Sequence, residues 1–278
     1  MAIACGVVVA IFWLFSSLSS SHYLPEPEEI IQGVPSDGKH VLRRRSNEQS
    51  LRIKVNTQSP SMERLEASKK SLIVDRLLPE AVVYFRRTLR VRRTTSPIRL
   101  QRKCKSGNSV MRSVNGSLFR FCVGECDVET KCGTVRVPAT DLDVCRTCDR
   151  GETRCVSETA ASGRGVRDAD FVLYVSASTT SHCKAREDVV AYASVCQQEQ
   201  SLDRPVAGFV NFCEEKVSSS SIHYSNLVAI VKHELFHALG FSSSLYGYYR
   251  AEDGTPLTTR RKDGRPLIRW SDKVCIGI

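Results

Sequence analysis

Twelve cysteines constrain this chain more strongly than any other feature, because most of them lie between Cys104 and Cys213. In an oxidising compartment such a set forms a disulfide framework, although the sequence does not assign the pairs. Removing a leader that contains Cys5 leaves eleven, so one thiol is free or pairs outside the chain. Cys145 and Cys148 also have the spacing of half a zinc ribbon or a redox motif, but the neighbouring cysteines follow no ribbon spacing.

The amino-terminal residues favour the same compartment. Residues 2–15 form an apolar run of signal-peptide length, and a serine-rich flank follows at residues 16–21. We therefore expect residues 1–21 to be a signal peptide or an uncleaved membrane anchor, the second because no Lys or Arg precedes the run. The sequon at Asn115 and Ser117 predicts a glycosylated surface loop. These features favour the secretory pathway, with the chain secreted or associated with a membrane.

The segment that follows the leader is polar and contains prolines. Residues 22–50 include three consecutive arginines at 43–45, which predict a short pro-segment or linker with a processing site. Alternation of apolar and polar residues at 51–55 predicts a strand. An apolar stripe of helical spacing from residue 62 to about residue 93 predicts a helix, in which Pro79 predicts a kink or a break.

The second half of the chain predicts a sheet followed by a helix. Three apolar runs, at residues 171–175, 189–193 and 206–210, have the length of strands and are bounded by polar turns. Residues 226–239 carry apolar side chains at helical spacing, and Gly240 stands where a helix end favours a left-handed residue. The sequence therefore predicts an α+β fold in which the sheet precedes one long helix.

The predicted helix carries the pattern His-Glu-x-x-His at His233, Glu234 and His237. Residues four apart lie one turn above each other on the same helix face, so the two histidines can hold one zinc ion per chain. Glu234 can take a proton from a metal-bound water, which is the general-base role in zinc-dependent peptide hydrolysis. The alternative is a helix whose two histidines only face solvent or a polar core.

The block from His233 to Ser242 closely resembles the leishmanolysin family of zinc endopeptidases, especially its animal branch. Other segments that resemble the family are residues 51–55, 78–82, 132–138, 168–175, 206–211, 249–257 and 270–274. The resemblance implies a metzincin-like zincin fold with a mixed, twisted sheet, of which residues 51–278 form the N-terminal part of the catalytic domain. It implies that His233 and His237 bind zinc, that Glu234 is the general base, and that polypeptide substrates lie along the sheet edge.

The chain also departs from this family. Ordinary metzincins place a third histidine six residues after the second, where this chain has Ser243. Leishmanolysins carry a long insertion before their third histidine and then a methionine turn, and neither a histidine nor a methionine follows His237 here. We therefore expect a C-terminally truncated family member. No cysteine lies between Cys5 and Cys104, so latency through a propeptide cysteine is not expected.

Other side chains could complete the metal site. Glu252 and Asp253 follow the helix, as in proteases that use two histidines and a glutamate, but their segment is rich in turn residues. His223 is expected on the surface. The remaining histidines have no motif around them: His22, His40 and His182. The alternative to an active enzyme is therefore a catalytically inactive, secreted, disulfide-stapled binding protein derived from the protease.

The net charge of +10 is concentrated in part of the chain, because ten Lys and Arg residues lie between Arg86 and Arg112. We expect these residues to form a solvated helix end and a basic loop. The alternative is a surface that binds an acidic protein or a glycan. Nucleic acid is not expected, since no stacking aromatic residues accompany the arginines and the chain has features of an exported protein.

Overall fold

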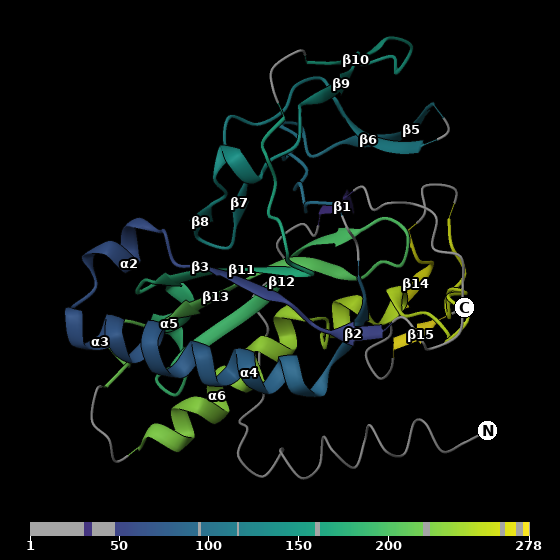
Figure 1. Ribbon diagram of the computed structural model, residues 1–278. Helices are drawn as coiled ribbons and strands as arrows, with labels where there is room; N and C mark the ends of the chain where they lie inside the picture. Colours follow the sequence, from purple (N-terminus) through teal and green to yellow (C-terminus); the bar gives the residue numbers. More distant parts are fainter. Residues whose placement is uncertain are drawn as a thin grey trace.

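A computed structural model gives the chain a mixed α+β fold (Figure 1). It describes residues 31–34, 48–93, 96–115, 117–158, 162–218, 223–261, 265–270 and 275–277. The predicted leader and the predicted processing site at residues 43–45 lie outside these ranges, as do His22 and His40. No helix within the described ranges is long and apolar enough to cross a membrane.

A five-stranded sheet forms the centre of the molecule, with the order β1-β12-β13-β11-β3. Its strands are β1 (Ile31–Val34), β3 (Ile53–Asn56), β11 (Phe171–Ala177), β12 (Ala191–Glu199) and β13 (Pro205–Phe212). β12 runs antiparallel to β13, and the other pairs are parallel. The strands predicted at residues 51–55, 171–175 and 206–210 are confirmed within two residues at each end.

The strand predicted at residues 189–193 begins two residues later and continues to Glu199. Its polar end is buried and bonded to distant residues. Gln197 Oε1 accepts from Gln101 N–H at 2.8 Å, and Gln197 Nε2 donates to Gln101 O at 2.9 Å. Glu199 accepts from Arg204 Nε at 3.1 Å. The strand therefore extends beyond its apolar run because non-local hydrogen bonds satisfy its polar side chains.

The segment predicted as one helix forms several elements. α2 (Pro60–Arg64) and α3 (Ala67–Ser71) are separated by extended backbone at Leu65, and the π-helical turn η3 (Leu72–Leu77) leads into α4 (Leu78–Thr88). Pro79 stands in the first turn of α4, where its missing N–H leaves no intrahelical bond unmade. The predicted break therefore lies earlier, at Leu65, and Pro79 stands at the start of a helix.

The predicted helix end at residue 93 is wrong. β4 (Arg90–Arg92) follows α4 and pairs antiparallel with β2 (Glu48–Ser50). Leu51 N–H also donates to Leu89 O at 3.2 Å. Pairing with a strand forty residues upstream ends the helix, and the local pattern of side chains could not show that partner.

Side chains alternate between the two faces of β11, and each face packs into a separate core. Phe171, Leu173 and Val175 pack with α4 and α6 (Tyr224–Ala238), whereas Val172 and Tyr174 pack with the disulfide-rich part. In Figure 1, α4 and α6 lie below the sheet and the disulfide-rich strands lie above it. The position of α6 is therefore fixed by a sheet that is buried on both faces.

The disulfide-rich part contains a second sheet with the order β10-β9-β6-β5. Its strands are β5 (Ser109–Val114), β6 (Ser117–Val123), β9 (Arg146–Cys148) and β10 (Cys155–Ser157). The shorter elements around the two sheets are β7 (Lys131–Cys132), β8 (Val135–Arg136), η4 (Ala139–Asp141), α5 (Ser181–Ala185), η6 (Ser243–Tyr248), β14 (Ile268–Trp270) and β15 (Cys275–Gly277). Asn115 is exposed at the turn between β5 and β6, in agreement with the predicted surface loop.

Ten cysteines form five disulfides: Cys104–Cys122, Cys126–Cys145, Cys132–Cys196, Cys148–Cys155 and Cys183–Cys213. The disulfide framework predicted for an oxidising compartment is thus confirmed. Cys145 and Cys148 each pair with another cysteine, so the zinc-ribbon and redox alternatives for this pair do not hold.

Candidate metal centre

Helix α6 carries the His-Glu-x-x-His pattern in its carboxyl-terminal half. Leu227, Val231, Leu235 and Ala238 are buried because they face the sheet at helical spacing. The predicted helix at residues 226–239 is therefore confirmed within two residues. His233 and His237 remain half-buried, on the side of the helix that this apolar stripe does not occupy.

The helix ends at a chain reversal that positions one histidine. Gly240 has a φ of 122°, a conformation that other residues rarely adopt. Phe241 N–H donates to Phe236 O at 3.0 Å, and Phe241 O lies 2.7 Å from His237 Nδ1. Because a carbonyl oxygen only accepts, Nδ1 carries the proton and Nε2 keeps its lone pair for a metal. This contact fixes both the tautomer and the ring orientation of His237.

The two imidazoles have the spacing that a shared zinc ion requires. Their Nε2 atoms are 3.2 Å apart, and their ring centroids are 4.8 Å apart. Two ligand nitrogens of a tetrahedral zinc site stand about 3.3 Å apart when each Zn–N distance is roughly 2.0–2.1 Å. The histidine pair therefore fits one zinc ion.

Glu234 is buried between α6 and the sheet, with 7% of its surface exposed. Its Oε2 accepts a hydrogen bond from Ala193 N–H of β12 at 3.1 Å. Burial raises the pKa of this carboxyl to about 8, and the hydrogen bond from Ala193 opposes the shift. A cation held by the neighbouring imidazoles favours the charged form of the carboxyl.

The acidic candidates for a third ligand do not join this pair. Within the described residues, no group of three His, Cys, Asp or Glu side chains comes together to hold a metal ion. Glu252 and Asp253 lie in an exposed turn, where Asp253 accepts from Thr255 N–H at 2.8 Å. Ser243, at the position of the ordinary third histidine, begins the short helix η6.

The other described histidines also lie apart from the pair. His223 is exposed at the start of α6, as the sequence predicts. His182 packs edge to face against Tyr192, with ring centroids 4.7 Å apart. Burial lowers the pKa of His182, and nearby Arg186 and Lys216 lower it further. Of the residues predicted for the site, the structure thus brings together the rings of His233 and His237, whereas the Glu234 carboxyl on the same helix is bonded to β12.

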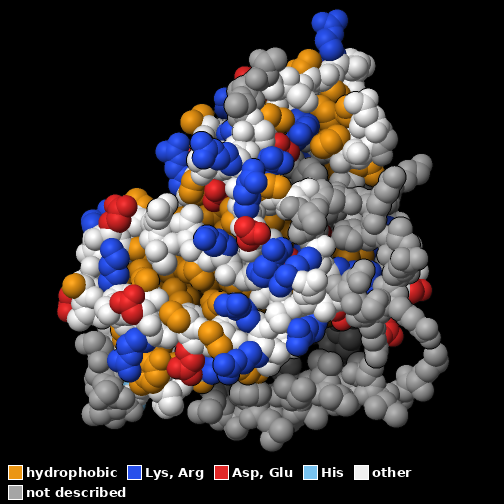
Figure 2. All heavy atoms as spheres, in the orientation of Figure 1, with side chains coloured by type: hydrophobic (Ala, Val, Ile, Leu, Met, Phe, Trp, Pro, Cys, Tyr) orange, Lys and Arg blue, Asp and Glu red, His pale blue; other side chains and the backbone are white. Residues whose placement is uncertain are grey.

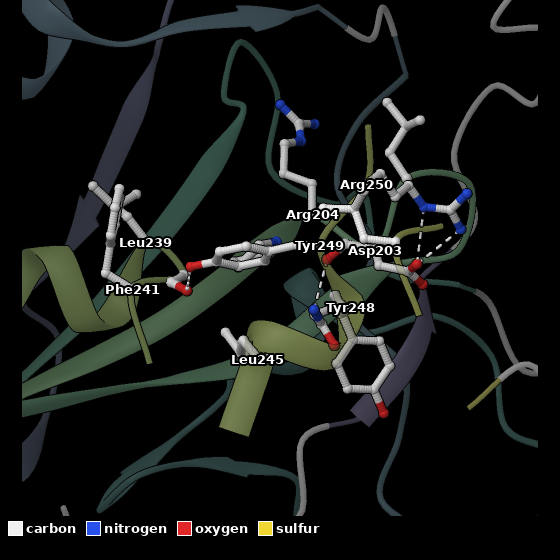
Figure 3. A pocket seen from close by; sticks show the side chains of 13 residues that line it. Asp203, Arg204, Leu239, Phe241, Leu245, Tyr248, Tyr249 and Arg250 are labelled. Carbon is white, nitrogen blue, oxygen red and sulfur yellow. Dashed lines mark hydrogen bonds and ion pairs between the residues drawn. The ribbon is translucent and has the colours of Figure 1, made fainter. Parts of the chain in front are cut away.

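A cavity of about 350 Å³, which no sequence motif predicted, lies beside the carboxyl end of α6 (Figure 3). Its apolar wall consists of Pro205, Leu239, Phe241, Leu245, Tyr248, Tyr249 and Leu257. At the polar end, Asp203 accepts from Arg250 Nε at 2.9 Å and from Arg260 Nη2 at 2.8 Å. The only local signal for this cavity is the tyrosine cluster in residues 246–249.

Tyr249 connects this cavity to the metal centre. Its hydroxyl is directed toward the end of α6 in Figure 3 and donates to Gly240 O at 2.9 Å. Burial raises the pKa of Tyr249 to about 12, although 39% of the residue surface is exposed. The tyrosine therefore supports the same chain reversal that places Phe241 O against His237.

Paired imidazoles on a helix that packs on a sheet, with a buried carboxyl on the same helix, are an arrangement found in zinc-dependent hydrolases. Comparison with known proteins narrows the class. Residues 105–274 match the family model described as leishmanolysin, and the chain belongs to that family of metallopeptidases, whose members are zinc enzymes.

The relatives found by comparison agree with this family. The chain is 41% identical over 287 residues to the leishmanolysin-like peptidase of Drosophila melanogaster. The aligned region covers 94% of this chain and 41% of the relative. It is 38% identical to the leishmanolysin-like peptidase of Caenorhabditis elegans, over 90% of this chain and 39% of the relative. It is 35% identical to the ciliated left-right organizer metallopeptidase of Xenopus laevis, over 66% of this chain and 26% of the relative. The chain thus spans about two fifths of the length of the leishmanolysin-like peptidases.

Proposed function

We propose that this chain provides the zinc-binding helix and the general base of a metalloendopeptidase with a metzincin-like zincin fold. The observation that carries the proposal is the 3.2 Å separation of the His233 and His237 Nε2 atoms beside the buried Glu234 carboxyl. One zinc ion held by these histidines would polarise a peptide carbonyl and acidify a bound water. The five disulfides favour an extracellular or secretory location for this activity.

Glu234 would take a proton from the zinc-bound water and pass it to the leaving amine. Ala193 N–H holds Oε2, so the carboxyl keeps a fixed orientation while Oε1 exchanges the proton. A group that first accepts a proton and then passes it to a leaving amine works best when its pKa lies near the working pH. Burial raises the pKa of Glu234, and a zinc ion on the neighbouring imidazoles would oppose this shift, so both would set the proton affinity of the base.

The substrate would be an extended polypeptide along β12. Ala193 pairs with Val210 of β13 on one side, and its N–H donates to Glu234 on the other. Among the described residues, no strand pairs with this side of β12 at residues 191–195, so an extended peptide can lie along it beside the general base. β1 pairs with the same strand farther along, at Gln197, Gln198 and Glu199. We accordingly place the substrate next to residues 191–195.

Metal content and cleavage of an unfolded polypeptide, measured on the same preparation, test this function. After incubation with Zn²⁺ and dialysis, we expect one zinc ion per chain, and loss of this ion in His237→Ala. Glu234→Gln should keep the zinc and lose cleavage by roughly 10²- to 10⁴-fold, the usual size of a general-base contribution. His223→Ala removes an exposed histidine from the same helix and should change neither property.

A second candidate is a non-catalytic binding protein that keeps the fold of the protease. It is favoured by one observation, that the described residues bring no third His, Cys, Asp or Glu to the histidine pair. The same experiment separates the two candidates. A chain without zinc, or with equal cleavage by the native chain and Glu234→Gln, excludes the enzyme and leaves the binding protein.

A further inference from the structure

The basic residues between Arg86 and Arg112 do not form one surface. Lys105 and Arg112 lie in the disulfide-rich part and pair with Glu125 at 2.9 Å and with Glu152 at 3.1 Å. In the same part, Arg136 pairs with Glu129 at 3.2 Å. Part of the predicted basic stripe is therefore neutralised by acidic side chains that are distant in the sequence.

A different group of cations gathers beside the edge strand β3. We call it the basic band and define it as Arg52, Lys54, Arg90, Arg93, Arg99, Arg164 and Arg167. Five of the seven side chains are exposed, and Arg52 and Arg99 are half-buried. Three come from the predicted stripe and four from elsewhere in the sequence, so only the fold brings them together.

Hydrogen bonds connect the segments that carry the band. Arg90 Nη1 donates to Ser50 Oγ at 2.9 Å and Arg93 Nη2 donates to Ser50 O at 3.4 Å, two residues before Arg52. Asp170 N–H donates to Arg52 O at 2.8 Å, which sets the segment that contains Arg167 beside β3. The contacts continue from this segment toward the disulfide-rich part.

The next contacts place Arg99 against the same segment. Ile98 and Val166 exchange both backbone hydrogen bonds at 2.9 Å. Arg99 and Arg167 are the next residues on the two sides of this bridge. Arg99 Nε donates to Gly163 O at 3.0 Å, next to Arg164. The band therefore crosses from the β2–β4 ribbon, over the end of β3, to the base of the disulfide-rich part.

Acidic side chains neutralise only one member of the band. Asp168 and Asp170 both pair with Arg52, at 3.7 Å and 3.0 Å. Among the described residues, no carboxylate forms an ion pair with the other six cations. Figure 2 shows Lys and Arg side chains gathered across the middle of this face, with few Asp or Glu side chains between them. The positive charge of the band is thus available to a partner.

We propose that the basic band binds a linear sulfated polysaccharide. Lys54 and the exposed arginines follow one another from the β2–β4 ribbon to the disulfide-rich part, so the band offers charges in succession to a chain that carries repeated anions. Guanidinium groups form charge-assisted, paired hydrogen bonds with the oxygens of such anions. The five disulfides favour a compartment in which sulfated polysaccharides are the abundant linear polyanions.

Two other polyanions fit the band less well. Among the described residues, no aromatic ring makes a cation–π contact with a member of the band, whereas single-stranded nucleic acid is bound through bases stacked on aromatic side chains. Anionic lipids concentrate in the cytoplasmic leaflet, on the opposite side of the membrane from a disulfide-bonded domain. The polysaccharide is therefore the partner that the chemistry favours.

Affinity for heparin, measured with the full oxidised chain by titration and by salt elution, tests the proposal. The first variant combines Arg93→Gln, Arg164→Gln and Arg167→Gln, three exposed residues without a described ion pair. The matched control combines Lys105→Gln, Arg112→Gln and Arg136→Gln, which removes the same charge from residues that form ion pairs. Both variants are checked for folding by circular dichroism.

We expect the band variant to bind heparin about 10- to 100-fold more weakly at low salt, with a shallower dependence of affinity on salt concentration. The control should bind like the native chain. Equal losses in the two variants would show an effect of net charge alone and overturn the proposal. Tighter binding to phosphatidylserine vesicles or to oligo(dT) than to heparin, through the same residues, would overturn it in favour of a lipid surface or a nucleic acid.

Discussion

At the scale of single residues, the metal centre depends on contacts that lie outside the His-Glu-x-x-His pattern. The pattern predicted His233, Glu234 and His237 because four-residue spacing on a helix is a local property. It could not predict that Phe241 O holds His237, or that Tyr249 supports Gly240, because both contacts depend on how the chain reverses after the helix. Residues that orient a ligand are therefore harder to find from sequence than the ligand itself.

Replacement of Tyr249 by Phe tests this support. The change removes the hydrogen bond to Gly240 O, and we expect the free energy of unfolding at pH 8 to fall by about 1 kcal/mol, a modest value because the ring is partly exposed. Urea unfolding of the native chain and of Tyr249→Phe measures the difference. An unchanged midpoint would contradict the supporting role of the hydroxyl.

The difference in stability between the native chain and Tyr249→Phe should also depend on pH. Burial raises the pKa of Tyr249 to about 12 from an ordinary value near 10, so the folded state holds the proton more tightly than the unfolded state. The stabilisation is complete below pH 10 and is lost as the pH rises through 12. The stability difference between the native chain and Tyr249→Phe should therefore shrink between pH 9 and pH 11.5, measured by short urea titrations, and a constant difference would contradict the shift.

At the scale of elements, the helix that carries the candidate metal centre packs closely on β13. Gly208 lies in β13 beneath Ala238, and a Cβ at this position would stand 2.7 Å from Ser194 O and 3.2 Å from Ala238 Cβ. Both distances are shorter than ordinary contacts. The second shows that the glycine lets the helix pack directly on the sheet, and the first shows that an added Cβ would also collide with the neighbouring strand β12. Its role is steric, and no strand pattern in the sequence indicates it.

Gly208→Ala should push α6 away from the sheet. We expect a loss of about 1–3 kcal/mol in the free energy of unfolding, the usual cost of overpacking, with weaker zinc retention at temperatures where the variant is folded. Gly151→Ala is the control, since the nearest atoms to its added Cβ belong to Thr153 at 3.9 Å. Equal stability of the two variants, measured by thermal unfolding, would show that this approach is not tight.

Elements were predictable where local periodicity and tertiary packing agree. β11, β13 and α6 are buried by the same apolar side chains that define their patterns. The prediction failed where a distant partner decides the structure. The apolar stripe predicted a helix to about residue 93, but β4 pairs with β2 and ends the helix earlier. The polar end of β12 was missed for the same reason, since Gln101 satisfies Gln197 from outside the strand.

At the scale of the whole molecule, one disulfide ties the disulfide-rich part to the central sheet. Cys132–Cys196 connects β7 of the disulfide-rich part to β12 across 64 residues, whereas Cys148–Cys155 closes a loop of 7 residues between β9 and β10. Ten cysteines permit many pairings, so the sequence indicated a framework without its connections. The position of the first bridge means that the strand beside Glu234 is covalently tied to the disulfide-rich part.

Loop length predicts which bridge matters more for stability. A disulfide restricts the unfolded chain more strongly when it closes a longer loop, which gives about 4 kcal/mol for Cys132–Cys196 and about 2 kcal/mol for Cys148–Cys155. We therefore expect Cys132→Ala with Cys196→Ala to lower the free energy of unfolding by clearly more than Cys148→Ala with Cys155→Ala, as measured by urea titration. The long bridge also anchors β12, so its removal should reduce zinc retention at the histidine pair. Removal of the short bridge should leave zinc retention unchanged. If both double variants lose stability and zinc equally, then the disulfides stabilise the molecule without holding β12 in place for the metal centre.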